Sequence, residues 1–299
     1  MEKKIIIPAS LERRLALYYK TNELSTKGFS NAEISKELGV DVDQVRRWVR
    51  GEKPKRVHRY EPDLSPGKDL AYVAGFYLGD GKDAGDEHKV RFELADKEQL
   101  EHVGGLVAKI LGREAKPLGR DGTFFIVDYD SVILSVFLNQ PLERLVAHFR
   151  GFESDFLRGF FDAEGYASCS VDSKKMTVSK FCVGVANTQL TYLQSVKTIF
   201  EQFAIRSVLR RTNKAGESMT IRGRTWIRRN DVYHLVVTGG VGIKTFRKTV
   251  GFHNPAKAQK LKDLVRLIGM RPDERYVWFQ TRYERRGRKW VKIDESSPI

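Results

Sequence analysis

A short helical pattern occurs twice in this 299-residue chain, and its repetition limits the possible folds more than any other feature. The segments DLAYVAGFYLGDG (69–81) and ESDFLRGFFDAEG (153–165) are compact apolar stretches that end in an acid and a glycine. Each precedes strand-like runs, an amphipathic helix and more strand. Such a duplication indicates a fold with pseudo-two-fold symmetry, built from two similar halves of one chain.

The periodicity after each segment predicts the same kinds of element in the two copies. In the first copy we expect strands over 89–95 and 123–129, and helices over 97–111 and 131–138. In the second copy we expect strands over 180–186, 207–212 and 232–237, a helix over 189–203, a segment over 242–250 and a last helix over 255–268. From Met270 onward the mixture of aromatic and basic residues is typical of a strand or a loosely held extension.

The N-terminal region predicts three helices. LERRLALYYKTNEL (11–24) has apolar residues at helical spacing; Ser30 can cap a short helix through Leu38, and Gly39 and Asp41 lead into a second through Val49. The residues expected to pack between these two helices are Ala32, Ile34, Leu38, Val40, Val45 and Trp48. Residues 10–52 resemble helix-turn-helix DNA-binding modules, which implies that Gln44, Arg46, Arg47 and Arg50 contact DNA. The alternative is a helical pair whose exposed face is only solvated.

The charge and composition favour a folded protein with a polyanionic partner. Lys and Arg number 53 against 38 Asp and Glu, so the net charge is +15, and nucleic acid is the first candidate. A hydrophobic content of 41% excludes a disordered basic tail. We interpret 53–68, which carries prolines and a basic cluster, as a linker.

Several other classes of protein do not fit the sequence. Cys169 and Cys182 are the only cysteines, which excludes a disulfide framework or a paired-cysteine zinc site and favours an intracellular protein. The six histidines lack metal-ligand spacing, and the glycines before Lys244 fail the spacing of an ATP-binding loop. The sequence contains no apolar run long enough to predict a membrane span or a secretion signal.

The two repeated helices carry the candidate chemistry. Small residues four apart, Gly75 with Gly79 and Gly159 with Ala163, predict that the helices pack closely on each other. The acids at residues 80 and 164 would then lie at the same end, each followed by a glycine suited to a left-handed C-cap. Two carboxylates at helix C-termini repel each other and the helix dipoles, and a divalent cation would relieve this. Oxygen-only ligands fit Mg²⁺ better than zinc.

The segments VAGFYLGDG (73–81) and LRGFFDAEG (157–165) resemble the paired signature helices of LAGLIDADG homing endonucleases in their single-chain, two-repeat form. The resemblance covers about residues 69–268. It implies an α+β fold with a duplicated αββαββα unit, whose antiparallel saddle-shaped sheets face the DNA major groove. The domains expected are a helix-turn-helix domain (1–52), a basic linker (53–68), two repeats (69–152 and 153–269) and a C-terminal extension (270–299).

The resemblance also assigns site residues. It implies that Asp80 and Glu164 are catalytic metal ligands, accompanied by Gly79 and Ala163, with Mg²⁺ as cofactor and Mn²⁺ able to replace it. Lys244 and Lys97 are similar to the lysines that such enzymes place beside the metals, although a solvated lysine is the alternative for both. The first signature departs from the family at Leu78, where its first acid would stand, whereas the second keeps Asp162.

Basic residues of the predicted strands are candidates for DNA contact. The stretch between Ile205 and Asn230 carries many arginines against one acid, which predicts a DNA-contacting hairpin. A mixed-charge strand in the first copy is a weaker candidate, because such a strand often forms only a solvated face. The residues singled out are Arg91, Lys116, Arg120, Arg206, Arg210, Arg211, Arg222, Arg224 and Arg228.

The function expected from this resemblance is site-specific double-strand DNA cleavage by a Mg²⁺-dependent monomer at a long, weakly symmetric target. The association with mobile introns implies a role in intron homing, and the RNA of its own intron is a further candidate partner. The alternative is a catalytically silent DNA-binding regulator or an RNA-splicing maturase; maturases can keep both acids. No pattern of the histidine-asparagine-histidine or GIY-YIG nuclease families is visible.

Overall fold

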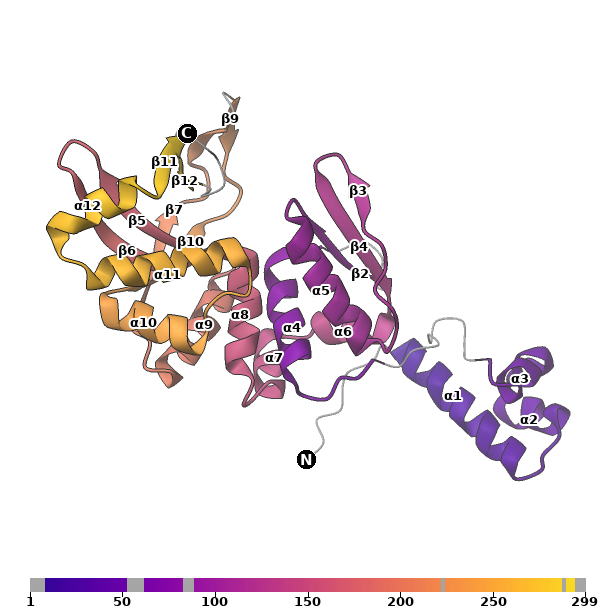
Figure 1. Ribbon diagram of the computed structural model, residues 1–299. Coiled ribbons are helices and arrows are strands. Elements are labelled where there is room, and N and C mark those ends of the chain that lie inside the picture. Colours follow the sequence, from indigo (N-terminus) through magenta and orange to yellow (C-terminus); the bar gives the residue numbers. More distant parts are fainter. Residues whose placement is uncertain (1–8, 53–61, 83–88, 222–223, 287–288, 294–299) are drawn as a thin grey trace. The chain divides into compact units, whose positions relative to one another are not determined.

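The computed structural model describes residues 9–52, 62–82, 89–221, 224–286 and 289–293 (Figure 1). The chain divides into two compact units, Met1–Phe152 and Glu153–Ile299. Within the described ranges, the helices are too short or too polar to cross a membrane.

The N-terminal region consists of three helices around a small core. The helices are α1 (Ala9–Thr26), α2 (Asn31–Leu38) and α3 (Val42–Val49). Ser30 and Glu33 form a capping box at the start of α2, Gly39 ends it in the left-handed region at φ 62°, and the Asp41 side chain caps α3. These predicted helices and caps are confirmed. The core consists of Leu24, Ile34, Val40, Val45 and Trp48.

One residue predicted for this core is misplaced. Ala32 is exposed, because it lies in the first turn of α2, on the side facing away from Trp48 and its neighbours. Leu24 of α1 occupies the core instead.

The first repeat is a four-stranded antiparallel sheet with helices. Its elements are α4 (Lys68–Asp80), β1 (Gly81–Lys82), β2 (Lys89–Leu94), α5 (Lys97–Ile110), β3 (Gly119–Asp121), β4 (Phe124–Asp130), α6 (Val132–Leu138) and α7 (Leu142–His148). The strand order is β1-β2-β4-β3. Alternation buries Val90, Phe92, Val127 and Tyr129 on one face, against which α4, α5 and α6 pack.

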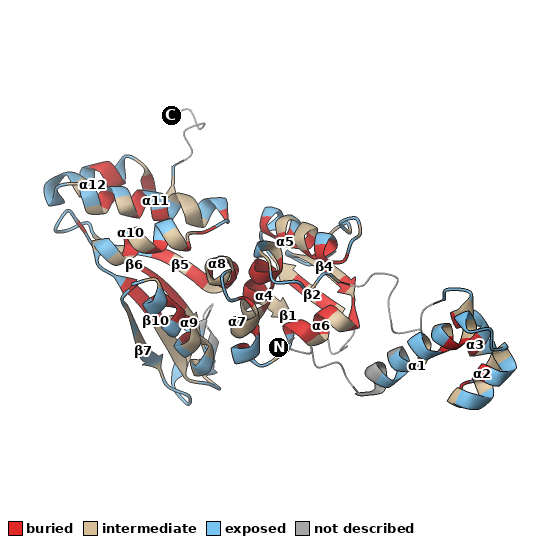
Figure 2. Ribbon diagram, turned by 90° about the horizontal axis from the view of Figure 1, so that it is seen from below, coloured by how far each residue is buried: buried red, intermediate tan, exposed pale blue. Residues whose placement is uncertain are grey.

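The second repeat has the same sheet topology. Its elements are α8 (Glu153–Glu164), β5 (Gly165–Asp172), β6 (Thr177–Asn187), α9 (Leu190–Gln202), β7 (Ser207–Asn213), β8 (Ser218–Ile221), β9 (Arg224–Ile227), β10 (Val232–Thr238), α10 (Gly240–Thr249) and α11 (Pro255–Gly269). The order β5-β6-β10-β7 repeats that of the first sheet, while β8 and β9 form a separate ribbon. Figure 2 shows the buried centres of β6 and β10, where Val183, Val185, Leu235 and Val237 face the helices. The duplicated α+β architecture is thus confirmed.

The segment after Met270 contains strand, as one of the two predicted alternatives has it, and over residues 271–286 it is not loosely held. It contains α12 (Pro272–Gln280) and a hairpin of β11 (Tyr283–Arg286) and β12 (Lys289–Lys292). Tyr276, Trp278 and Phe279 are buried against Val178 of the sheet, which ties the segment to the second repeat. Burial of these large rings outweighs the polar character of the surrounding sequence.

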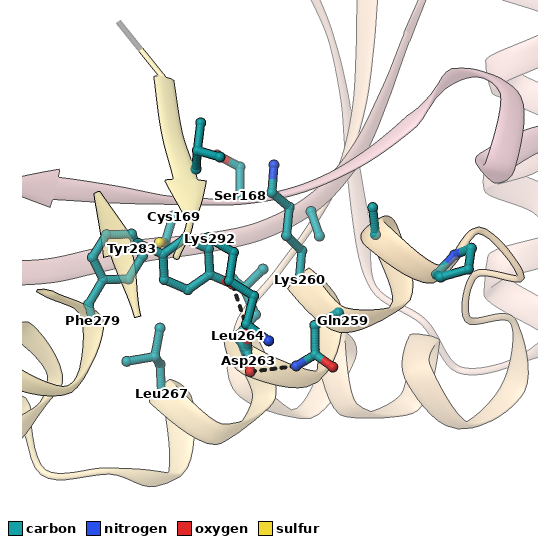
Figure 3. A pocket seen from close by; sticks show the side chains of 14 residues that line it. Ser168, Cys169, Gln259, Lys260, Asp263, Leu264, Leu267, Phe279, Tyr283 and Lys292 are labelled. Carbon is teal, nitrogen blue, oxygen red and sulfur yellow. Dashed lines mark hydrogen bonds between the residues drawn. The ribbon is translucent and has the colours of Figure 1, made fainter. Parts of the chain in front are cut away.

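A pocket of about 860 Å³ lies between α11, β5 and this hairpin (Figure 3). On its α11 side, the Asp263 carboxylate accepts hydrogen bonds from the Tyr283 hydroxyl (2.7 Å) and the Gln259 amide (2.9 Å). Tyr283 is thereby fixed to α11, and burial together with Asp263 raises its pKa well above the ordinary value.

Candidate functional site

Both signature helices run directly into a strand at the predicted acid. Asp80 is the last residue of α4 and Glu164 the last of α8, and Gly81 and Gly165 begin β1 and β5. The two glycines pair with the second strand of their sheets, opposite Phe92 and Val185 respectively. Each acid therefore lies at a fixed junction between a buried helix and the first strand.

The predicted left-handed conformation of the two glycines is wrong. Gly81 has φ −65° and ψ 134°, and Gly165 also lies outside the left-handed region. The reason for glycine is close approach: a Cβ at Gly165 would lie 2.5 Å from the Phe161 carbonyl oxygen, and one at Gly81 would collide with Tyr77. The strand leaves so close to the last helical turn that a side chain has no room.

Asp162, the first acid of the second signature, connects α8 to the residues that begin α11. Asp162 is 3% exposed, and its carboxylate accepts hydrogen bonds from the backbone N–H groups of His253 (2.9 and 3.1 Å) and Asn254 (3.1 Å). These residues precede α11, so Asp162 holds the start of α11 against α8. Leu78 stands at the corresponding place in the first repeat and cannot accept such bonds.

A lysine that the sequence analysis missed contacts the end of α8. Lys257 Nζ donates to the backbone carbonyls of Phe161, Asp162 and Ala163. A signal for it existed: Asn254 and Pro255 predict a helix start, so Lys257 falls in the first turn, where the helix dipole disfavours a cation. A lysine at such a position indicates that its ammonium group binds an acceptor outside its own helix.

The chemistry of the donor groups fits a hard divalent cation. Asp80 and Glu164 supply carboxylates at helix C-termini, where the dipole alone disfavours negative charge. The Ala163 carbonyl accepts a hydrogen bond from Lys257 at 3.0 Å, so this oxygen already has a cationic partner, and Ala163 as a metal ligand stays a prediction. Among the described residues, no three His, Cys, Asp or Glu are grouped as a complete metal site. Asp80 and Glu164 belong to different units, and their joint site, like Gly79 as a ligand, stays a prediction.

The two lysines predicted as catalytic lie on other elements. Lys97 begins α5, is exposed, and forms an ion pair with Glu101 at 3.3 Å. Lys244 is exposed on α10. A catalytic role for either residue stays a prediction.

The helix-free face of the second sheet carries a polar cluster. Residues opposite one another in register share a face, which places Arg210 beside His234 and His234 beside Ala186. The Tyr166 hydroxyl lies 3.4 Å from His234 Nδ1. Burial, reinforced by the nearby Arg210 guanidinium, lowers the pKa of His234, so this imidazole is neutral at pH 7.

Arg211 lies on the opposite face of β7 from Arg210. It pairs with Tyr233 in register and forms an ion pair with Asp231 at 3.0 Å. Of the two neighbouring arginines predicted to contact DNA, Arg210 is therefore the one on the helix-free face.

The helix-free face of the first sheet is charge-balanced. Arg91 donates to both Asp128 oxygens at 2.6 and 2.8 Å, and Lys116 Nζ lies 3.4 Å from Asp130. The hydrogen bonds from Arg91 lower the pKa of Asp128 below its ordinary value. Arg120, by contrast, lies over the Phe125 ring at 5.5 Å, on the edge strand β3.

The arginine-rich stretch predicted as one hairpin forms two structures. Arg206 is exposed just before β7, which belongs to the main sheet, and the ribbon β8–β9 follows. Arg224 begins β9, and Arg228 follows this strand, where its backbone bonds to Gly216 and Glu217. Arg222 lies outside the described residues. Trp226 and Ile227 of β9 are 53% and 63% exposed.

On α3, the predicted DNA-contacting residues face outward. Arg46, Arg47 and Arg50 are exposed and Gln44 is half-buried. Arg46 forms an ion pair with Asp43 at 2.9 Å.

The model of a LAGLIDADG-like domain matches residues 151–251. This range runs from just before α8 to just after α10, so the similarity lies within the second repeat.

Among curated proteins, the chain is similar to the uncharacterized protein MJ0398 of Methanocaldococcus jannaschii, with 26% identity over 84% of this chain and 93% of that protein. Elongation factor 2 of Methanopyrus kandleri is 23% identical over 84% of this chain, but the match spans only 18% of that protein.

Among solved structures, I-DmoI in complex with DNA and Ca has a TM-score of 0.45 and 19% identity, covering 67% of this chain and 98% of that one. The LAGLIDADG homing endonuclease I-GzeII in complex with its DNA target has a TM-score of 0.44 and 13% identity, covering 67% and 90%.

Proposed function

We propose that this protein is a site-specific DNA endonuclease that depends on a divalent metal ion, Mg²⁺ with Mn²⁺ as a substitute. The observation that carries the proposal is the repeated junction of buried helix, acid, glycine and strand at Asp80 and Glu164, in two repeats with one sheet topology. The LAGLIDADG-like match over the second repeat supports the same class. The protein would act as a monomer on a long, weakly symmetric site and serve intron homing.

The two acids would hold the metal, with water and DNA phosphate completing its coordination. A bound divalent cation activates water as the nucleophile and stabilises the leaving oxygen of the phosphodiester. The contribution of the chain is to hold each carboxylate at a junction between a buried helix and a paired strand, which only a glycine permits because a Cβ at Gly81 or Gly165 would collide with the last helical turn. A covalent intermediate with the protein is not required.

The helix-free sheet faces and α3 would contact the DNA. The net charge of +15 favours a phosphate backbone, and Arg210 lies on the helix-free face of the second sheet. The ion pair between Arg91 and Asp128 reduces the free positive charge of the first sheet. We expect the second repeat to supply more of the phosphate contacts than the first.

The test is cleavage of a random DNA library with Mg²⁺ and with Mn²⁺. Asp80→Asn and Glu164→Gln are compared with the parental protein and with Glu201→Gln, which changes an exposed acid of α9. We expect site-specific double-strand breaks from the parental protein and the control, and none from the other two variants, while DNA binding persists. Tight binding without cleavage by the parental protein would contradict the proposal and favour the DNA-binding regulator or the RNA-splicing maturase.

A further inference from the structure

One side chain of α11 holds the last turn of α8. Lys257 Nζ donates to the carbonyl oxygens of Phe161 (3.2 Å), Asp162 (2.5 Å) and Ala163 (3.0 Å). Because α8 ends at Glu164, these are three of the four terminal carbonyls that lack the regular helical partner. One ammonium group thus binds most of the acceptors at the end of α8 and offsets the negative end of its dipole.

A second set of hydrogen bonds runs from α11 back to α8. The buried Asp162 carboxylate accepts from the backbone N–H groups of His253 and Asn254. The Asn254 side chain in turn caps α11 by accepting from the Lys257 N–H at 3.0 Å. We name Asp162, His253, Asn254 and Lys257 the α8–α11 clasp. Its hydrogen bonds run in both directions: Asp162 of α8 binds the start of α11, and Lys257 of α11 binds the end of α8.

The local sequence of α11 does not explain a lysine at this place. Lys257 lies in the first helical turn, where the positive end of the helix dipole disfavours a cation. The same ammonium is favoured at the C-terminal end of α8, where the dipole is negative. The presence of a lysine at position 257 is therefore explained by its contact with α8.

The first repeat is built differently at the corresponding place. Leu78 replaces the acid, and α7 begins after Pro141 without a side-chain cap. The clasp is thus a property of the repeat that carries Glu164.

We propose that Lys257 is a positioning residue for Glu164, an inference that rests on the proposed nuclease function. Glu164 is the last residue of the turn whose carbonyls Lys257 binds, so the direction of its carboxylate follows the geometry of that turn. A misplacement of about 1 Å in a reacting group can slow a reaction about a hundredfold. Lys257 therefore acts through the backbone of α8, without contact to substrate.

The kinetic test compares Lys257→Met and Lys257→Arg with the parental protein. The matched control is Lys262→Met, which removes the same charge from an exposed position of α11. With DNA selected by parental cleavage, we expect Lys257→Met to lower the single-turnover rate roughly 10- to 100-fold while the Kd for DNA stays unchanged. Lys257→Arg, which keeps charge and donors, should recover most of the rate, and Lys262→Met should keep all of it.

The second readout is amide hydrogen exchange of the free full-length protein. Lys257→Met should accelerate exchange over residues 158–166, whereas Lys262→Met should not. If Lys257→Met unfolds the second unit, Lys257→Gln, which keeps two donors, replaces it under the same criteria.

Three results would overturn the proposal: unchanged exchange over 158–166, a loosened turn with the parental cleavage rate, or a rate loss matched by an equal loss of DNA affinity. A parental protein that binds DNA but never cleaves it would instead overturn the proposed function, and with it the role of Lys257 toward Glu164. The exchange measurement separates these cases because it needs neither DNA nor metal.

Discussion

At the scale of single residues, the glycine after each acid shows how tightly the candidate site is built. A methyl group at Gly165 would lie 2.5 Å from the Phe161 carbonyl oxygen, so Gly165→Ala must displace the end of α8. We expect a loss of about 1–3 kcal/mol in the free energy of unfolding, as for an overpacked core, measured by urea denaturation. The control is Gly105→Ala in α5, where a Cβ meets no atom within 4 Å. It should stabilise the protein by about 0.5–1 kcal/mol, and the same sign for both changes would contradict this account.

The Arg91–Asp128 pair gives a residue-scale prediction that depends on pH. Hydrogen bonds from Arg91 lower the pKa of Asp128 in the folded protein below its ordinary value of 3.8. The pair therefore stabilises the fold fully above the unfolded-state pKa, and this contribution is lost as pH falls through the lower folded-state value. We expect Asp128→Asn to cost about 1 kcal/mol at pH 7.

The measurement is urea unfolding of Asp128→Asn and parental protein between pH 7 and pH 3. The stability difference between them should begin to shrink below about pH 4, because the Asp128 carboxylate of the unfolded parental chain takes up a proton there while that of the folded protein stays charged. Asp121→Asn, an exposed change on β3 of the same sheet, serves as the control and should differ little from the parental protein at either pH. A difference that stays constant over the range would show that the charge of Asp128 is not its source.

At the scale of elements, the start of α2 depends on a reciprocal cap. The Ser30 hydroxyl accepts from the Glu33 N–H, while the Glu33 carboxylate accepts from the Ser30 N–H at 2.8 Å. We expect Ser30→Ala to destabilise the three-helix region by about 1 kcal/mol. The measurement is amide hydrogen exchange of α2 and α3, because a local loss of stability in these helices need not change the unfolding of the two repeats. Lys36→Ala, exposed on the same helix, should change exchange little, and an equal effect of the two substitutions would rule out the cap as the cause.

Elements with strong local signals were predictable from the sequence. α2 and α3 begin and end at the predicted residues because Ser30, Gly39 and Asp41 carry the capping chemistry themselves. The short strands β1 and β3 were missed, because two or three residues are too few for an alternating pattern. The helix α12 was missed because its stability comes from burying Trp278 and Phe279 against Val178, a contact between distant parts of the chain.

In the candidate site, too, residues with a local sequence signal were predictable and contacts between distant residues were not. Asp80 and Glu164 stand in a repeated local pattern, so their position at the ends of α4 and α8 was predictable, whereas their role as metal ligands stays a prediction. The contact of Lys257 with α8 joins residues more than ninety positions apart: its place in a first helical turn indicates that it has a partner, but no local pattern identifies α8 as that partner. The glycines were identified, but the physical reason was wrong: the sequence indicates a special backbone, whereas the structure requires an absent side chain. What limited the prediction of the site from the sequence was therefore the separation of the contacting residues along the chain, and not the type of chemistry involved.

At the scale of the whole molecule, one topology is repeated with different additions. Both sheets have the same strand order, but the second repeat also carries the ribbon β8–β9, the helix α12 and the hairpin β11–β12, and its α11 is longer than α7 at the corresponding place of the first repeat. The basic surface is uneven as well: Arg91 and Lys116 of the first repeat are paired with acids, while Arg210 lies on a helix-free face. The proposed DNA contacts should therefore differ between the two halves, which is consistent with a target of weak symmetry.

The N-terminal helices allow this electrostatic account to be tested in the full-length chain. Arg46, Arg47 and Arg50 are exposed on and just after α3, and each phosphate contact adds about 0.9 to the slope of log affinity against log salt. Replacing all three with alanine should lower this slope by about 2–3 and weaken binding at least about tenfold at low salt. The measurement is DNA binding by fluorescence anisotropy across a salt series.

The matched control for this prediction is the triple change of Arg13, Arg14 and Lys20 to alanine, which removes the same charge from exposed positions of α1. If α3 lies against the DNA backbone, the control should lower the slope much less, because charges farther than about 10 Å from phosphate are screened at 0.1 M salt. Equal slopes for the two triple variants would mean that the N-terminal helices contribute only net charge. In that case Asp43, Gln44 and their arginine neighbours would form a solvated surface, and DNA recognition would rest on the two sheets.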